Sequence, residues 1–200
     1  MAFASYFDPR YQGKPDLFCQ RQMMQDLWDQ SLRGGLAGIE GKDVTLDEYF
    51  DLNPIDPNGS FEFGKIKFDI VQTVHVSAKY RIMDSYGLMF NDPDTQKRVY
   101  ITTDVQFAPE TSLKAYYAES DLIIHDCETA PFMSGVHAHY NQLKTLKEEV
   151  KKKMLLIHYQ DNVVDEWDKW NDQAKADGFM GFIRGGEFYP LLYRPDITAL

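Results

Sequence analysis

The sequence predicts one α/β domain, and two features of its order support this prediction. Short apolar runs, which are typical of buried strands, end in a histidine or an aspartate at several points of the chain. Segments with helical periodicity separate the later runs, so that strand, helix and strand follow one another. Such alternation is typical of a sheet covered by helices. We expect residues 1–60 to form a helical lid segment and residues 61–200 to form the sheet with its helices.

The composition suits this class and excludes others. The 200 residues are 44% hydrophobic and 26% charged, which is enough apolar material for one globular core. A formal net charge of -10 argues against an extended nucleic-acid surface but allows a small anionic substrate held by a metal. Cys19 and Cys127 stand far apart, which fits a reducing compartment. Without a membrane-spanning apolar run or a secretion signal, the prediction is a cytoplasmic protein with no membrane contact.

The lid segment contains two helix signals. Apolar residues recur with helical spacing over residues 21–32 and predict one amphipathic helix. Thr45, followed three residues later by Glu48, has the form of a capping box and predicts a second, short helix. Residues 53–59 are rich in turn formers and are predicted to be a connection.

The rest of the chain alternates between strands and helices. Apolar and polar residues alternate over residues 61–70, as in an edge strand with one wet face. The elements predicted after it are strands at 83–90 and 98–103, a helix that begins at Pro109 and Glu110, a strand at 121–125, a helix at 141–153, a strand at 154–157, a helix at 163–176 and short strands around Gly185 and Gly186.

Polar side chains that can bind a metal stand at the ends of these strands. His75 and Asp104 end strands within residues 71–104, His125 and Asp126 follow the run DLII, and His158 follows the run MLLI. A single histidine in such a place is more often structural than a ligand. Together, imidazole and carboxylate groups form a set suited to zinc, manganese or iron. We therefore expect a metal site over the sheet.

The order of these segments carries a family resemblance. His75 stands in TVHVSAKYRIMDSYGL, Asp104 in VYITTDVQ, Asp126 in HDCET, His137 in SGVHAHYNQL and His158 in LLIHYQDN. This ordered set, which covers roughly residues 65–162, resembles the metallo-β-lactamase-fold hydrolases. The nearest branch is that of the ribonuclease Z-like enzymes and cyclic-nucleotide phosphodiesterases. The resemblance implies a metallo-β-lactamase-like αββα sandwich.

The resemblance also implies a metal site made of His75, Asp104 and His158. His75 would bind a first metal and His158 a second, while the two oxygens of Asp104 would bridge them. In the family a glycine precedes this aspartate, whereas here Thr103 does. The implied cofactor is Zn2+ or Mn2+, and one ion or none is also compatible with the sequence.

A proton donor is implied next to this metal site. In the family, the position that matches His137 protonates the leaving group. Its acidic partner would be Asp126 or Glu128. His139 lies in range of the same role and is otherwise expected to contact the substrate. His125 has no counterpart among the family's ligands, so we expect it to be structural.

The predicted substrate is a small anionic nucleotide or phosphodiester. Tyr86 and Phe107 are its expected contacts, together with the region around Gly185 and Gly186. The inherited chemistry would be phosphodiester hydrolysis, on RNA or on a cyclic nucleotide, impaired in this chain. The alternative is a catalytically inactive protein that sequesters a nucleotide or binds another protein.

One departure from the family accounts for the expected impairment. The family's H-x-H-x-D-H signature is absent, since all five histidines lie at or after His75. We therefore expect a relative that is truncated at its N-terminus. Three explanations stay open: a catalytically silent relative, a fragment completed by another polypeptide or by an upstream start, or a single metal held by His75, Asp104 and His158. An uncovered sheet edge in such a chain predicts a homo-oligomer.

Overall fold

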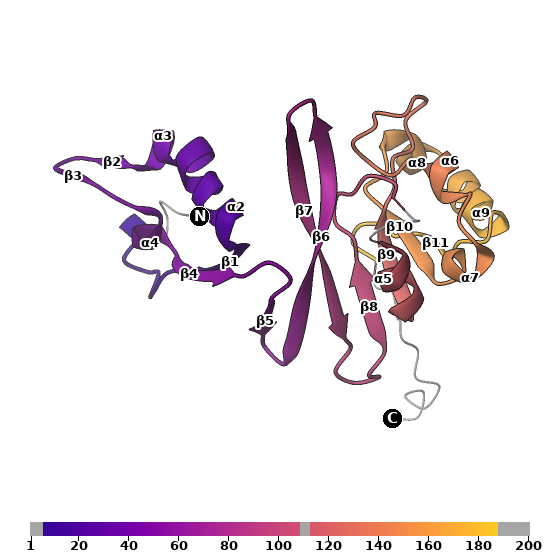
Figure 1. Cartoon of the computed structure of the whole chain (residues 1–200), viewed down its shortest axis with the longest axis horizontal. Helices are drawn as coiled ribbons and strands as arrows, with labels where there is room; N and C mark the ends of the chain where they lie inside the picture. The colour runs from indigo at the N-terminus through magenta and orange to yellow at the C-terminus, as the bar shows by residue number, and fades with distance from the viewer. Residues whose placement is uncertain (1–5, 109–112, 188–200) are drawn as a thin grey trace. The chain divides into compact units, whose positions relative to one another are not determined.

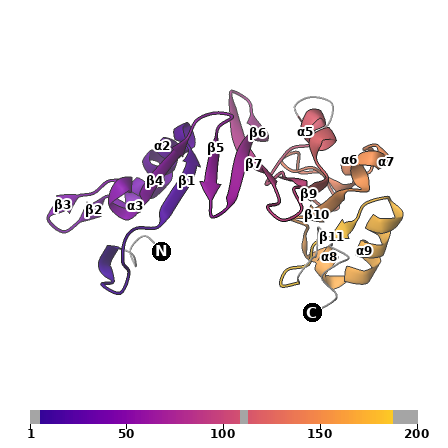
Figure 2. The ribbon, with the colours of Figure 1, turned by 90° about the horizontal axis from the view of Figure 1, so that it is seen from below.

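The computed structural model describes residues 6–108 and 113–187. The chain divides into two compact units, Met1–Phe61 and Glu62–Leu200, and each is described by itself. The ribbon is shown in two views at right angles (Figures 1 and 2). The single domain expected over residues 1–200 stays a prediction.

The first unit is built around a parallel pair of strands. β1 (Asp16–Gln20) pairs with β4 (Asp51–Ile55), from Asp16 opposite Asp51 to Gln20 opposite Ile55. Parallel strands need a long crossover connection, and the helices and a short hairpin supply it here. The connection consists of α2 (Arg21–Leu27), the π-helical turn η1 (Trp28–Leu32), α3 (Arg33–Leu36), β2 (Gly38–Ile39), β3 (Lys42–Asp43) and α4 (Leu46–Tyr49).

Three sequence predictions for this unit are corrected by the structure. The helix expected over residues 21–32 changes from α to π geometry at Trp28. The capping box is absent, because the Thr45 hydroxyl bonds to the Asp47 carboxylate instead of a backbone N–H. The connection expected over residues 53–59 begins later, because pairing with β1 holds the first three of those residues in β4.

A seven-stranded sheet carries the main core. Its order is β11-β10-β9-β8-β7-β6-β5. The strands are β5 (Ser60–Phe63), β6 (Ile66–Ala78), β7 (Arg81–Asn91), β8 (Arg98–Ile101), β9 (Leu122–Asp126), β10 (Met154–Ile157) and β11 (Gly181–Phe182). β6 and β7 form a long antiparallel hairpin, visible at the centre of Figure 1. β6 has a bulge at His75. β8 pairs antiparallel with β7, whereas β8 to β11 run parallel to one another.

Two helices that the sequence predicts for this unit are each divided into two shorter ones. They are α5 (Leu113–Glu119), α6 (Tyr140–Leu143), α7 (Glu148–Lys151), α8 (Asp161–Asp165) and α9 (Trp167–Ala176), of which α9 lies beside β11 (Figure 2). The single helix expected over residues 141–153 is wrong. The Thr145 hydroxyl donates to the Gln142 carbonyl oxygen at 2.7 Å, and Lys147 is extended, so the chain starts a new helix there.

Two further boundaries differ from the prediction. The helix expected over residues 163–176 is interrupted at Glu166, whose φ of -121° and ψ of 45° are not helical. Short strands were expected around Gly185 and Gly186, but these two residues form a turn and β11 lies earlier, at Gly181–Phe182. The part of that prediction after residue 187 lies outside the described residues. The predicted helix start at Pro109 and Glu110 lies outside the described residues.

The core fills the space between the sheet and its helices. The buried side chains of this core come from strands and helices alike, and they include Val71, Met89, Tyr100, Ile123, Met154 and Leu156 from the sheet, and Tyr117, Leu143, Val163 and Ala174 from the helices. Within the described residues no helix is long and apolar enough to cross a membrane.

Candidate metal centre

Five polar side chains meet at one edge of the seven-stranded sheet, and we call them the His–Asp cluster. His75 lies on β6, Asp104 follows β8, Asp126 ends β9, His137 lies in the loop after β9, and His158 follows β10. They form two overlapping groups, His75 with Asp104 and His137, and Asp126 with His137 and His158. In each group the ligand atoms lie within 4.8 Å of one another. For Asp104, Asp126 and His158 the meeting is expected, since parallel strands end at the same edge of a sheet. His75 was expected to end a strand but lies within β6, at its bulge.

Asp126 is the centre of the hydrogen bonding in this cluster. Its side chain is 1% exposed, and its Oδ2 atom accepts from His137 Nδ1 at 2.8 Å and from the Val105 N–H at 2.9 Å. Its Oδ1 atom accepts from His158 Nδ1 at 3.0 Å. Because a carboxylate only accepts hydrogen bonds, both imidazoles carry a proton on Nδ1 here. Each neutral ring then keeps the lone pair of Nε2 for a metal or a proton.

His75 contains a nitrogen that the described residues leave without a partner. Its Nδ1 atom is buried and has no hydrogen-bond partner among the described residues. Its ring centroid lies 5.1 Å from that of His137. Buried polar atoms without a partner are rare because they cost free energy, and a metal ion would satisfy this one. The imidazole and carboxylate donors of the cluster therefore fit zinc or manganese.

One side of the cluster is open to solvent. Asp104 and His158 each have side chains that are 50% exposed, and Asp104 Oδ1 lies 3.5 Å from His158 Nδ1. His137 is 18% exposed. A small molecule can therefore reach the cluster from the side of Asp104 and His158, while Asp126 supports it from within.

The backbone is left-handed at two positions of the cluster. Thr103, directly before Asp104, has a φ of 54°, and His158 itself has a φ of 64°. This region is strained for a β-branched residue such as threonine. The family glycine expected before Asp104 would adopt it without strain. Such strained residues gather at functional sites, and here the Thr103 hydroxyl compensates by donating to the Tyr86 carbonyl at 3.0 Å.

The structure separates the two candidate partners of His137. Asp126 bonds to His137, whereas Glu128 Oε2 accepts from the Ser134 N–H at 2.9 Å and so holds the intervening loop. His139 is the N-cap of α6: Nδ1 accepts from the Asn141 N–H at 3.2 Å, and Nε2 donates to a backbone carbonyl oxygen at 2.9 Å. The substrate-binding role of His139 stays a prediction.

The contacts of His125 agree with the structural role expected for it. It is fully buried, and the Tyr117 hydroxyl donates to its Nε2 at 2.6 Å. Its Nδ1 donates to the carbonyl oxygen of Asp126, also at 2.6 Å. Burial lowers the pKa of His125, so the ring is neutral.

The remaining predicted contacts lie on three other segments of the fold. Tyr86 is on β7, Phe107 packs against the main core, and Gly185 and Gly186 follow β11. Their substrate-binding roles stay predictions. The sequence analysis did not predict the hydrogen bond between Asp126 and His158. The available signal was that Asp126 ends one apolar run and His158 follows another, and these runs form the neighbouring strands β9 and β10.

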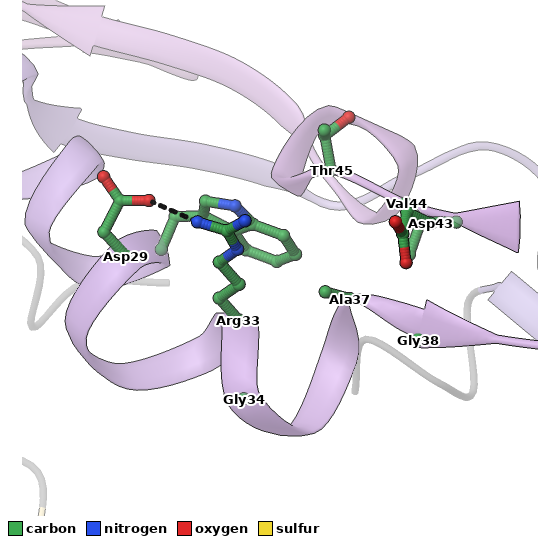
Figure 3. Close-up of a pocket in the computed structure, with 9 residues that line it drawn as sticks. Asp29, Arg33, Gly34, Ala37, Gly38, Asp43, Val44 and Thr45 are labelled. Carbon is green, nitrogen blue, oxygen red and sulfur yellow. Dashed lines mark ion pairs between the residues drawn. The ribbon is translucent and has the colours of Figure 1, made fainter.

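A separate pocket of about 650 Å³ lies within the first unit (Figure 3). Asp29 and Arg33 form an ion pair on one wall, with Oδ1 of the aspartate 3.9 Å from Nη1 of the arginine. Asp43 and Thr45 lie on the other side of the pocket in this view. The lining residues are Trp28, Asp29, Arg33, Gly34, Ala37, Gly38, Asp43, Val44 and Thr45.

Similarity to solved structures identifies the class of the protein as the metallo-β-lactamase fold: the metallo-beta-lactamase fold protein YhfI from Bacillus subtilis has a TM-score of 0.50 at 18% identity, over 79% of this chain and 58% of that chain. Solved structures share this fold. Unliganded yeast PDE1 has a TM-score of 0.60 at 10% identity, over 91% of this chain and 61% of that chain. A diphosphatase from the PhnP family has a TM-score of 0.55 at 16% identity, over 82% of this chain and 55% of that chain. The fold predicted from the sequence is thus confirmed.

Within this class, the chain belongs to the anti-Pycsar protein Apyc1 family, whose profile matches residues 1–189. A relative from Paenibacillus harenae is 34% identical over 155 residues, which are 77% of this chain and 59% of the relative. One from Bacillus phage BSP38 is 30% identical over 188 residues, 89% of this chain and 66% of the relative. The chain thus spans less than two thirds of either relative. The sequence resemblance had identified the fold but not this family.

Proposed function

We propose that the His–Asp cluster is a metal-dependent site that hydrolyses the phosphodiester of a small cyclic nucleotide. The observation that carries the proposal is the convergence of three histidines and two aspartates in the His–Asp cluster. Membership of the anti-Pycsar Apyc1 family supports a cyclic nucleotide as the ligand. The net charge of -10 disfavours RNA, because a long polyanion would be repelled along most of its length.

His75, Asp104 and His158 would hold the metal, as Zn2+ or Mn2+. When bound, the metal would polarise a phosphoryl oxygen and lower the pKa of a water that attacks phosphorus. The exposure of Asp104 and His158 leaves room for the substrate on that side. The buried, unpartnered Nδ1 of His75 would gain a ligand bond.

His137 would act as the general acid. Its Nδ1 is fixed by Asp126, so its Nε2 is the atom free to give a proton to the leaving oxygen. The buried Asp126 carboxylate would stabilise the imidazolium form that donates this proton. Asp126 would also hold His158, and so it would link the acid to the metal ligand.

The test compares hydrolysis of cyclic nucleotides and of a short RNA by the whole chain, with zinc, manganese or a chelator. We expect metal-dependent conversion of a 3′,5′-cyclic nucleotide and no cleavage of RNA. His137→Gln should lower turnover by about 10²–10⁴-fold while metal content stays the same. His75→Ala should lose both turnover and metal.

Two buried acids of one segment provide a matched pair of variants. Asp126→Asn should lower turnover strongly, because the amide keeps one acceptor oxygen in place of two and so cannot accept from both His137 and His158. Glu128→Gln should leave turnover within about threefold, since its carboxylate bonds only to the loop backbone among the contacts described. Equal losses in both variants would contradict the assigned roles.

The same assay separates the rival functions. Recovery of intact nucleotide in a one-to-one ratio after denaturation, without turnover, would replace hydrolysis by sequestration. Cleavage of RNA in preference to cyclic nucleotides would assign a different substrate. A chain that binds neither metal nor nucleotide would leave only an interaction role.

A further inference from the structure

Beneath the His–Asp cluster lies a buried hydroxyl that contacts the backbone of both carboxylate segments. Thr102 follows β8 and is fully buried. Its Oγ1 accepts from the N–H of Asp126 at 2.9 Å and donates to the carbonyl oxygen of Thr103 at 2.8 Å. One side chain therefore joins the end of β9 to the residue directly before Asp104.

This junction lies where two like charges converge. Asp104 Oδ1 and Asp126 Oδ1 lie 3.5 Å and 3.0 Å from the same atom, His158 Nδ1. Carboxylates that share a partner repel one another, so backbone contacts are needed to keep them at this spacing. The left-handed Thr103 stands between the hydroxyl and Asp104, so a small shift there would turn the Asp104 side chain.

A second hydroxyl fixes the other side of Asp104. Ser85 Oγ donates to the carbonyl oxygen of Asp104, and the Thr73 and Ser85 hydroxyl oxygens lie 2.6 Å apart. Ser85 and Thr73 lie on β7 and β6, so this contact ties Asp104 to the antiparallel part of the sheet. Among these three hydroxyls, Thr102 alone bonds to the backbone of Asp126 in the contacts described.

We propose that Thr102 is a positioning residue that sets Asp126 relative to Asp104, and so fixes the spacing of the cluster. The expected effect of Thr102 on metal binding rests on the proposed function. The hydrogen bonds of Thr102 themselves do not require a metal. Valine has nearly the shape of threonine, so it would fill the same space and remove only the two hydrogen bonds. The loss would reach the cluster through the backbone of Asp126.

The test compares Thr102→Val with Thr102→Ser in the whole chain. Zinc affinity is measured by competition with a chromophoric chelator, and long-range 1H–15N spectra without zinc report the Nδ1 protons of His137 and His158. We expect Thr102→Val to weaken zinc binding about 10–100-fold and to shift both histidine signals. Thr102→Ser keeps the hydroxyl and should stay within about threefold of the parent.

Ser120→Ala is the matched control. Ser120 is also buried, and its hydroxyl donates to the Tyr116 carbonyl at 2.6 Å, just before β9 begins and so at the opposite end of that strand from Asp126. It should leave zinc affinity and the histidine signals unchanged. If Thr102→Val does not fold, Thr102→Cys keeps a similar volume with a much weaker hydrogen-bonding group and should change both readouts in the same direction.

Three results would overturn the proposal: unchanged zinc affinity and histidine signals in a folded Thr102→Val variant, equal effects of Thr102→Val and Ser120→Ala, or no rescue by serine. A parent chain that binds no zinc would instead count against the proposed function. In that case the histidine signals of the Thr102 variants still decide whether this hydroxyl positions the cluster.

Discussion

The ends of β9 and β10 have the same sequence pattern, but their histidines lie in different environments. Each is an apolar run with a histidine at its end, His125 on β9 and His158 after β10. His125 is fully buried, with both ring nitrogens bonded inside the protein. His158 has a half-exposed side chain, lies in the left-handed region and faces two carboxylates. One histidine stabilises the fold and the other belongs to the site.

Strand register explains the difference. His125 lies opposite Leu156 and Asp126 lies opposite Ile157, so His158 comes one residue beyond the last pair. Side chains alternate along a strand, and His125 therefore points toward Tyr117 while Asp126 points toward the cluster. His125, which lies within the paired part of β9, therefore bonds to groups inside the protein. His158, which lies one residue past the paired part of β10, bonds to the cluster instead.

The largest expected effect is on stability, at His125. His125→Ala should lower the free energy of unfolding by about 3–5 kcal/mol, because it leaves a cavity and unpairs both the Tyr117 hydroxyl and the Asp126 carbonyl. Urea unfolding measures this loss. At saturating zinc, the number of ions bound by the folded variant should not change. A loss of less than about 1 kcal/mol in the free energy of unfolding would contradict the structural role of His125.

His158→Ala should show the reverse pattern. Zinc affinity should fall by about 100-fold, equivalent to about 2.7 kcal/mol, because a proposed ligand is removed. The free energy of unfolding should change by no more than about 1 kcal/mol, since the side chain is half exposed. Competition with a chelator measures the affinity. Unchanged zinc binding would show that His158 is not a ligand.

The smallest expected effect is that of Tyr117→Phe, which should change stability at the end of β9 without affecting the cluster. Tyr117→Phe removes only the hydroxyl that donates to His125 Nε2 and should lower the free energy of unfolding by about 1 kcal/mol. Tyr117 contacts the side chain of no cluster residue in the bonds described, so turnover and zinc affinity should match those of the parent. Thermal unfolding with a parallel activity assay tests this. A marked loss of activity at full stability would place Tyr117 in the site.

The sheet could be predicted from the sequence because its signals are local. Apolar runs located β7 to β10 closely, whereas the single strand expected over residues 61–70 is divided by a turn between β5 and β6. The parallel pair of β1 and β4 was missed, because Asn53 and Pro54 are typical of turns and only the distant partner strand makes them extended. The breaks at Lys147 and Glu166 were missed because helical periodicity continues across both.

The residues of the candidate site could be predicted from the sequence, but the contacts between them could not. His75, Asp104, Asp126, His137 and His158 were all named, and the structure brings them together. The choice of Asp126 over Glu128 depends on which of two buried side chains faces His137, and sequence does not fix that. The hydroxyl contact of Thr102 with Asp126 depends on the register between β8 and β9, because it joins residues 24 positions apart.

The most direct test of the account is the metal content of the purified chain, measured by plasma mass spectrometry in the parent, His75→Ala and His125→Ala. We predict at least about one zinc or manganese ion per chain in the parent and in folded His125→Ala, and loss of the bound ion in His75→Ala. Absence of metal from the parent after incubation with either ion, or equal content in all three proteins, would contradict a metal site at the His–Asp cluster.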